Sequence, residues 1–215
     1  MKNIEEFKNK IICGDCLEVM KDIPDKSVDL VLTDPPFGIN GEQEIKITEK
    51  ALKIAKKKAK NMVVIMDWRY SHRISSLFEK EKIGEMIWEY SWISGGRSKA
   101  KYGILPTHNI ILMFGDIKDF HFLTGSIIKR QKGFSSPRQC SYANKTGHPF
   151  EKPIALIKYL LEKIDANLIL DPFLGSGTTA VAVKQLKRNF IGIEINPDYC
   201  KIAEDRLKQQ LLFHT

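Results

Sequence analysis

A short run of residues at positions 34–37 has the composition of a rigid hydrogen-bond acceptor. It consists of Asp34, Pro35, Pro36 and Phe37, and it follows an apolar run at 28–33. Proline fixes φ and has no backbone N–H, and a residue that precedes proline is held extended. The Asp34 carboxylate and the neighbouring carbonyls therefore accept hydrogen bonds in set directions. They suit an amine with two N–H donors on a flat ring such as adenine or cytosine, on which Phe37 would stack. The non-functional alternative is a strand end followed by a proline-rich turn.

A second motif, at 171–180, has the composition of a nucleotide-binding turn. Gly175, Gly177 and Ala180 form the pattern G-x-G-x-x-A between an apolar run and a predicted helix. Small residues at such a turn let a ligand approach the backbone near the helix N-terminus. Glu194 ends the next predicted strand about 20 residues later, a spacing that suits a carboxylate bound to ribose hydroxyls. Together they predict a site for an adenosine-containing ligand. Asp15, just after another predicted strand, could accept from the adenine amine or simply lie in a surface turn.

The elements that must position these motifs alternate between strands and helices. A continuous apolar run such as 61–66 is typical of a parallel strand covered on both faces. The predicted strands are 11–13, 28–33, 61–66, 84–92, 108–114, 168–171 and 190–194. The predicted helices include 48–60, 71–82 and 176–188, with others beginning at Pro153 and at Pro197 after an Asn196 cap. This alternation predicts one α/β domain over residues 1–215 with a doubly wound, mostly parallel sheet.

Charge is concentrated in one part of the chain. The chain has 215 residues and a formal net charge of +8. Residues 95–152 contain ten basic and three acidic residues, a net charge of +7, so nearly all of the excess lies there. Such a stretch indicates a polyanionic partner, with a merely solvated basic loop as the alternative. Within it, 115–147 lacks periodicity and is predicted to be a long loop. The lysines of 48–60 are interpreted instead as a solvated helix face.

Cysteine usage and hydropathy indicate a cytoplasmic protein. Cys13 and Cys16 form a C-x-x-C pair, but no second pair or paired histidines complete a zinc site. We therefore expect buried, reduced thiols and no metal. No apolar run reaches the roughly 18 residues of a membrane span, and residues 1–6 lack the apolar region of a signal peptide.

The two motifs in this order resemble the DNA amino methyltransferases that use S-adenosylmethionine. The resemblance is to the circularly permuted, or beta, class, in which the catalytic motif precedes the cofactor motif. Residues 148–153 and 108–114 resemble the family's motif before the cofactor half and its last sheet strand. The similarity runs from about residue 11 to 208 and weakens over 115–147, where the family has its target-recognition region. Three positions depart from the family: Phe37, Asn109 and Phe150 replace a commoner tyrosine, acid and hydroxyl residue.

The resemblance implies a fold, a cofactor and a set of site residues. It implies a Rossmann-like, seven-stranded methyltransferase sheet in permuted order, with a catalytic half (1–114), a short recognition insertion (115–147) and a cofactor half (148–215). It implies duplex DNA as partner, base flipping, and a restriction-modification role, and a short recognition region makes a homodimer possible. Residues 34–37 would be catalytic. The cofactor residues would be Asp15, Cys16, Asp34, Lys152, Asp171, Phe173, Gly175, Ser176, Gly177, Thr178 and Glu194. The DNA contacts would be Arg97, Lys99, Lys101, Arg130, Lys132 and Arg138.

Methyl transfer to the N6 amine of adenine is the reaction that the resemblance favours. Cytosine N4 methylation is the nearest alternative, although the family's cytosine enzymes usually have serine where this chain has Asp34. Cytosine C5 methylation needs a cysteine nucleophile, usually after a proline, and Cys140 follows Gln139. An RNA or protein-glutamine methyltransferase could use a related acceptor motif, and a non-catalytic DNA binder could keep the basic stretch. A nicotinamide-linked dehydrogenase would share the Gly-rich turn but leaves the prolines at 35 and 36 unexplained.

Overall fold

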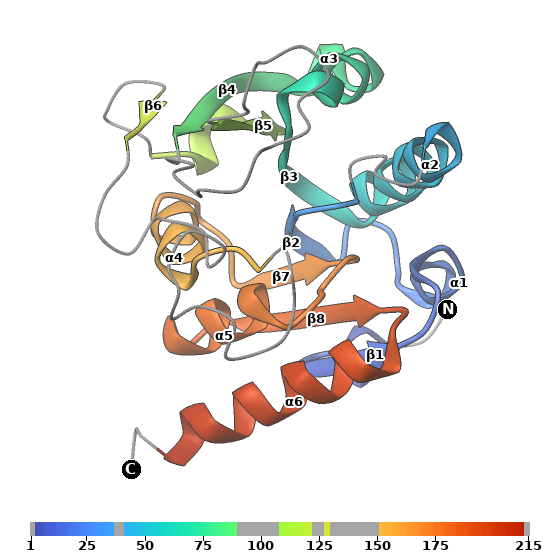
Figure 1. Cartoon of the computed structure of the whole chain (residues 1–215), viewed down its shortest axis with the longest axis vertical. Coiled ribbons are helices and arrows are strands. Elements are labelled where there is room, and N and C mark those ends of the chain that lie inside the picture. The colour runs from blue at the N-terminus through green and yellow to red at the C-terminus, as the bar shows by residue number, and fades with distance from the viewer. Residues whose placement is uncertain (1–2, 37–40, 90–107, 122–126, 130–150, 213–215) are drawn as a thin grey trace, which may run out of the picture.

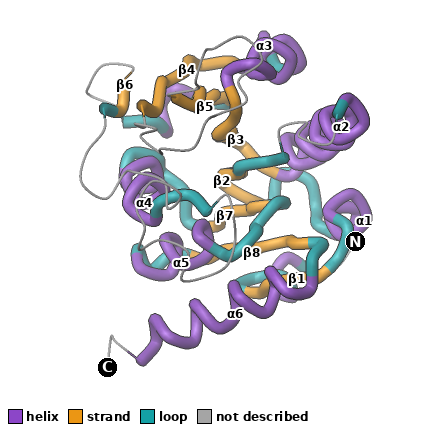
Figure 2. Tube along the Cα trace, in the orientation of Figure 1, coloured by secondary structure: helices purple, strands orange, loops and turns teal. Residues whose placement is uncertain are grey.

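The protein is an α/β sandwich built on one mixed sheet, with helices on both faces (Figures 1 and 2). The computed structural model describes residues 3–36, 41–89, 108–121, 127–129 and 151–212. The strand order across the sheet is β1-β8-β7-β2-β3-β5-β4-β6. The strands are β1 (Lys10–Cys13), β2 (Val28–Thr33), β3 (Ala59–Asp67), β4 (Lys82–Glu89), β5 (His108–Phe114), β6 (Ile127–Ile128), β7 (Leu168–Asp171) and β8 (Asn189–Glu194).

The directions of the strands confirm a doubly wound, mostly parallel sheet. Neighbouring strands from β1 through β8, β7 and β2 to β3 are all parallel. Strand β5 alone runs antiparallel to both of its neighbours, β3 and β4. Seven strands were expected, and the eighth is β6, whose two residues pair with Ile87 and Trp88 of β4. It lies in a segment expected to be a loop, because two residues are too short to produce a detectable sequence period.

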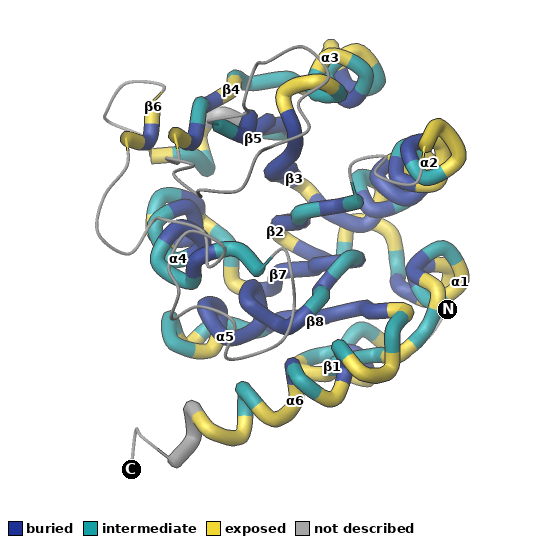
Figure 3. The backbone as a smooth tube through the Cα atoms, in the orientation of Figure 1, coloured by how far each residue is buried: buried dark blue, intermediate teal, exposed yellow. Residues whose placement is uncertain are grey.

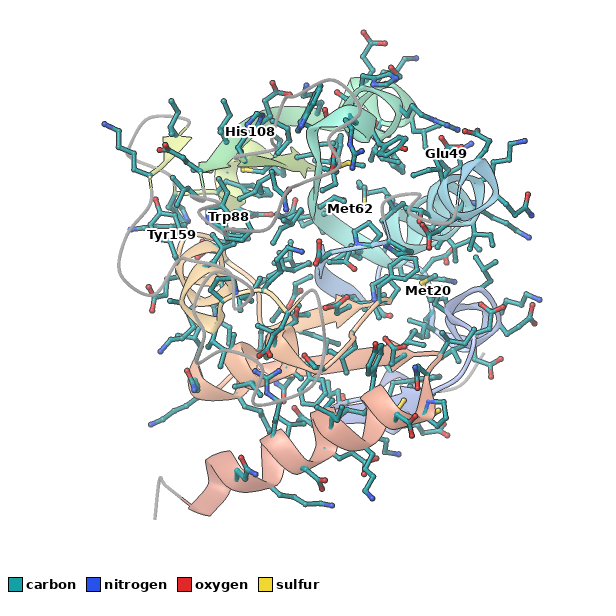
Figure 4. All side chains as sticks on the ribbon, in the orientation of Figure 1. Met20, Glu49, Met62, Trp88, His108 and Tyr159 are labelled. Carbon is teal, nitrogen blue, oxygen red and sulfur yellow. The ribbon has the colours of Figure 1, made fainter. Side chains whose placement is uncertain are left out.

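Two hydrophobic cores cover the two faces of the sheet. One core packs α1 (Cys16–Asp22), α2 (Glu42–Lys58) and α3 (Trp68–Leu77) on the first face. The other packs α4 (Ile154–Glu162), α5 (Thr178–Gln185) and α6 (Pro197–Leu212) on the second. Met20 and Met62 belong to the first core, whereas Trp88 and Tyr159 lie on the α4 side (Figure 4). Short 3₁₀ turns complete the described elements: η1 (Ile4–Glu6), η2 (Glu79–Glu81) and η3 (Ile117–Asp119).

Alternation along the strands explains how the sheet fills both cores. In β2, Val31 packs into the core with α1–α3, whereas Leu30 and Leu32 pack into the core with α4–α6. Successive strand side chains point to opposite faces, so a strand covered on both sides is apolar at nearly every position. The central strands are accordingly buried, and the exposed residues lie on the outer helix surfaces, the edge strands and the loops (Figure 3). None of the described helices is long and apolar enough to cross a membrane.

The order of the strands reverses between β2 and β7. The chain passes from β2 outward to β3, and from β7 outward in the opposite direction to β8. In doubly wound sheets, ligands bind outside the carboxyl ends of the strands at such a reversal. The topology therefore directs attention to the residues that follow β2 and β7, which are the residues of the two sequence motifs.

The cysteines agree only in part with the expectation of buried thiols. Cys16 and Cys200 are buried, and the Cys200 thiol donates to the Glu194 carbonyl oxygen over 3.4 Å. Cys13 is exposed, which the sequence interpretation did not predict. The reason is its place at the end of β1, an edge strand whose two end residues are both exposed. Cys140 lies outside the described residues.

Candidate active site

The predicted cofactor residues lie along the carboxyl ends of four neighbouring parallel strands. Asp15 and Cys16 follow β1, Glu194 ends β8, and Asp171 ends β7. Asp34 follows β2, the next strand in the same row. The structure thus brings together the two motifs, although more than one hundred residues separate them in sequence.

Asp34, at the end of β2, is half-buried, and one of its carboxylate oxygens is fully buried without a hydrogen-bond partner among the described residues. Its Oδ2 accepts from the Lys152 ammonium, and the Lys152 side chain is only 11% exposed. Its Oδ1 is, among the described residues, a buried side-chain oxygen with no hydrogen-bond partner. Burial raises the pKa of Asp34, and the positive charge and hydrogen bond of Lys152 oppose that effect. A buried acceptor is costly without a donor, so Oδ1 keeps the capacity to accept a further N–H group.

The backbone after Asp34 is tied to α2. Pro35 is buried, and the Pro36 carbonyl oxygen accepts from the Thr48 hydroxyl over 3.2 Å. Thr48 is 1% exposed, so this bond anchors the motif to the first core. Phe37, the expected stacking residue, lies outside the described residues.

A buried carboxylate, Asp171, lies near Asp34. The Thr33 hydroxyl donates to Asp171 Oδ1 over 2.7 Å, and the Phe173 N–H donates to the same oxygen over 3.1 Å. Burial raises the pKa of Asp171 to about 6, partly offset by hydrogen bonds from Thr179, Thr33 and the Phe173 backbone. The Asp34 charge also raises that pKa. Asp171 therefore joins the ends of β2 and β7 and shapes the turn that follows.

Glu194 holds the Gly-rich turn in place. Its Oε2 accepts from the Gly175 N–H and its Oε1 from the Asn196 N–H, both over 2.8 Å. Gly175 has a φ of 56°, in the left-handed region that favours glycine. Because each carboxylate oxygen can accept more than one hydrogen bond, both oxygens keep capacity for ribose hydroxyls. The contacts shown by the structure give Glu194 a structural role in the Gly-rich turn, and its binding of ribose stays a prediction.

Asp15 and Cys16 lie next to Glu194. The Gly14 N–H donates to the Glu194 carbonyl oxygen over 2.9 Å, which joins the ends of β1 and β8. Asp15 is exposed, and its Oδ1 caps α1 by accepting from the Leu17 N–H over 2.8 Å. Burial, followed by the charge of Asp15, raises the pKa of the Cys16 thiol to about 11, so it is a neutral packing group. Asp15 thus has a structural role as the cap of α1. The predicted hydrogen bond from the adenine amine would use its other carboxylate oxygen.

Arg206 of α6 contacts the Gly-rich turn in a way that the sequence did not predict. Its Nη1 donates to the Ser176 carbonyl over 2.8 Å, to the Ser176 hydroxyl over 3.1 Å and to the Thr178 hydroxyl over 3.3 Å. Its Nη2 pairs with Glu151 Oε1 at 2.6 Å. Ser176 and Thr178, predicted as cofactor residues, are therefore bound to the protein itself. An arginine in a terminal helix gives no sequence signal for this role, whereas Thr33, a polar residue in an apolar strand, does give one.

Gly177 has a packing role in addition to any ligand role. Its φ is 87°, and a Cβ placed on it would lie 2.6 Å from the Ala203 Cβ of α6. The second glycine of the motif therefore allows α6 to approach the turn. Phe173 is half-buried and packs against the core with α1–α3.

The predicted DNA contacts all lie outside the described residues: Arg97, Lys99, Lys101, Arg130, Lys132 and Arg138. So does Phe150.

Comparisons with known proteins agree with this geometry. The profile of a family described as DNA methylase matches residues 28–205. The type II methyltransferase M.HpaI of Haemophilus parainfluenzae is 27% identical over 94% of this chain and 74% of its own. The DNA adenine methyltransferase YhdJ of Escherichia coli is 29% identical over 92% of this chain and 82% of its own. The crystal structure of the M1.HpyAVI–SAM complex superposes with a TM-score of 0.70 at 26% identity, covering 92% of this chain and 98% of that one. Since the family profile spans both motifs and most of the sheet, this chain belongs to the DNA methylase family.

Proposed function

We propose that this DNA methylase transfers a methyl group from S-adenosylmethionine to the N6 amine of adenine in duplex DNA. The observation that carries the proposal is Asp34 Oδ1, a buried acceptor without a partner among the described residues, at the strand reversal beside the Gly-rich turn. A relative of this chain is named a DNA adenine methyltransferase, and a neighbour in structure was solved with SAM.

The residues of the carboxyl edge fit S-adenosylmethionine. Glu194 is oriented by two backbone N–H groups and would bind the ribose hydroxyls, with Asp15 close by for the adenine amine. Gly175 and the turn up to Thr178 would pass beneath the ligand, and Asp171, Phe173 and Lys152 would border it. When bound, the cofactor supplies an electrophilic methyl group on its sulfonium sulfur.

The protein's own contribution is to orient the target amine. The lone pair of an exocyclic amine is delocalised into the ring, so the nitrogen is a poor nucleophile. Asp34 Oδ1 and the Pro35 carbonyl would each accept one N–H bond, which favours a pyramidal nitrogen whose lone pair is available. Phe37 would stack on the base, which must leave the duplex because its amine is otherwise paired. No covalent intermediate with the enzyme is required.

Lys152 supports this role by favouring the charged form of Asp34 against the effect of burial. A buried carboxylate favours its neutral form, and a neutral carboxyl is a weaker acceptor. The Lys152 ammonium on Oδ2 opposes that tendency and leaves Oδ1 for the amine. The sequence motif placed Lys152 among the cofactor residues, and its contact with Asp34 supports a role on the catalytic side of the site.

We also propose the organisation of the whole protein. Residues 1–114 form the catalytic half, 148–215 the cofactor half, and 115–147 with the basic residues from Arg97 to Arg138 form the DNA-recognition part. Because this part is short, a homodimer would enlarge the DNA contact. The protein would act in the cytoplasm, on duplex DNA, in a restriction-modification setting.

A binding and transfer assay tests the proposed function. We expect S-adenosylhomocysteine to bind and NAD not to bind in calorimetry, and label from the methyl group of S-adenosylmethionine to enter duplex DNA. Preferential binding of NAD would indicate a dehydrogenase instead. DNA binding without any transfer would indicate a non-catalytic relative.

A further inference from the structure

Two neighbouring residues before α4 contact opposite parts of the active site. Glu151 pairs with Arg206, which also donates to Ser176 and Thr178 of the Gly-rich turn. Lys152 pairs with Asp34 at the end of β2. The four charged side chains of the two ion pairs are mostly buried. Arg206 is 14% exposed and Glu151 9%, whereas Lys152 is 11% exposed and Asp34 24%.

The backbone between the two pairs is restrained. Lys152 precedes Pro153, and a residue before proline is held in an extended conformation. Pro153 is the N-cap of α4, with φ −63° and ψ 131°. In extended backbone, neighbouring side chains point to opposite sides. The Glu151 contact with Arg206 therefore fixes the position from which Lys152 reaches Asp34.

We propose that Arg206 is a positioning residue that couples the Gly-rich turn to the Asp34 carboxylate through Glu151 and Lys152. The proposal rests on the proposed function for the role of Asp34 as amine acceptor, but the coupling itself is a property of the protein alone. Through it, a change at the Gly-rich turn, such as occupation by the cofactor, would alter the orientation and charge of Asp34.

The contacts favour this role over a purely structural anchor. A buried guanidinium needs a partner, and Glu151 alone would satisfy the charge. Arg206 instead uses a second nitrogen for three acceptors on the Gly-rich turn, so a single planar group connects two segments that face the ligand. Burial lowers the pKa of Arg206, and Glu151 opposes that effect.

Lys152 is the charged group that contacts the Asp34 carboxylate directly, so the titration of Asp34 can report on the coupling. Among the described residues, the groups identified beside it are Lys152, from the segment before α4, and Asp171, from β7. Displacement of Lys152 would remove the favourable charge and raise the pKa of Asp34. The displacement of Lys152 would change the pKa of Asp171 only through the change in the charge of Asp34.

Carbon-13 NMR of the aspartate carboxyl groups tests the coupling in the intact chain. The Asp34 signal is assigned by its loss in Asp34→Asn, and its pKa is measured in wild type, Arg206→Met, Lys152→Met and the double variant. We expect each single substitution to raise the Asp34 pKa, and the double variant to show no greater rise than Lys152→Met. The affinity for S-adenosylhomocysteine should also fall about 10-fold in Arg206→Met, since charge-assisted hydrogen bonds to the turn are lost.

Two further variants separate coupling from general destabilisation. Arg188 is a matched control, because its Nη1 donates to the Leu161 and Ile164 carbonyls at the end of α4 over 2.7 and 3.1 Å. Arg188→Met should lower the melting temperature and leave the Asp34 pKa unchanged. Arg206→Lys keeps a positive charge for Glu151 and loses donors to the turn. It should therefore preserve the Asp34 pKa better than Arg206→Met while still weakening S-adenosylhomocysteine binding.

The outcomes decide the proposal independently of the proposed function. The coupling would be overturned if the Asp34 pKa were unchanged in Arg206→Met. It would also be overturned if the pKa rise in the double variant equalled the sum of the rises in Arg206→Met and Lys152→Met. An equal shift in Arg188→Met would also overturn it. Wild-type protein that transfers no methyl group to adenine would instead overturn the proposed function, and the titration would still decide whether Arg206 acts on Asp34.

Discussion

The Asp34 carboxylate is subject to two opposing effects. Burial favours its protonated form, and the Lys152 ammonium favours the charged form. One oxygen is used by that ion pair, and the other is buried without a partner among the described residues. Under the proposed function, the ion pair on one oxygen would leave the other oxygen to orient the target amine.

Replacement of Asp34 should separate chemistry from binding. We expect Asp34→Ala to reduce methyl transfer about 10²- to 10³-fold, the scale of losing an oriented group that acts in the transition state. Binding of S-adenosylhomocysteine and of DNA should change by no more than a few-fold. Asp165→Ala is the control, since Asp165 is exposed and pairs with His121, outside both motifs. Turnover by Asp34→Ala equal to that of wild type would contradict the mechanism.

Asp171 should make the stability of the fold depend on pH. Its folded pKa of about 6 lies above the unfolded value of ~3.9, so the folded state binds the proton more tightly. The stabilisation is complete below about pH 4 and is lost as pH rises to about 6, a decrease of about 3 kcal/mol in the free energy of unfolding. The raised pKa of Asp34 likewise lowers the free energy of unfolding as pH rises.

The Asp171→Asn variant tests this pH dependence, because it keeps the shape and an acceptor for Thr33 and cannot ionise. We expect its free energy of unfolding in urea to fall much less between pH 4 and 6, and to exceed that of wild type at pH 7. Parallel pH curves for the two proteins would show that Asp171 does not titrate in this range.

The elements that the sequence predicted well are those with a strong apolar pattern. The runs at 28–33 and 61–66 form central strands because they are covered on both faces. The sequence predicts a helix over 71–82, but α3 begins at Trp68, because Asp67 caps it by accepting from the Arg69 N–H over 2.9 Å, and ends at Leu77. A cap that also ends a strand is hard to identify from residue types alone. The two-residue strand β6 could not be identified for a similar reason.

The packing of α6 against the Gly-rich turn gives a prediction at the level of elements. Gly177→Ala would place a Cβ 2.6 Å from the Ala203 Cβ and 3.0 Å from its Cα, at a φ of +87°. We expect a loss of about 2 kcal/mol or more in the free energy of unfolding, with weaker S-adenosylhomocysteine binding as α6 shifts. Gly84→Ala is the matched control, since its nearest neighbour is the Met113 Cε at 3.7 Å. Equal urea midpoints for the two variants and wild type would contradict this account of Gly177.

At the scale of the whole molecule, topology explains why the site could be anticipated from the sequence. Each motif follows an apolar strand, and parallel strands present their carboxyl ends at one edge, so Asp34, Asp171 and Glu194 had to lie at the same edge. Contacts between side chains distant in sequence could not be anticipated. The Lys152 pair with Asp34 and the Arg206 contacts depend on how α4 and α6 pack, which no local pattern encodes.

The proposed homodimer is also a property of the whole molecule. We expect sedimentation to give a mass near twice 24.6 kDa, with the dimer fraction rising on addition of duplex DNA. A sedimenting mass of one chain, with and without DNA, would show that a single copy performs recognition.

The identity of the methylated base tests the central claim most directly. Duplex DNA is incubated with the protein and S-adenosylmethionine labelled on its methyl group, digested to nucleosides, and separated by chromatography with mass detection. The proposed mechanism predicts label in N6-methyldeoxyadenosine, and label reduced about 10²- to 10³-fold when Asp34→Ala replaces wild type. Label in N4-methyldeoxycytidine would contradict it, because Asp34 would then orient a cytosine amine.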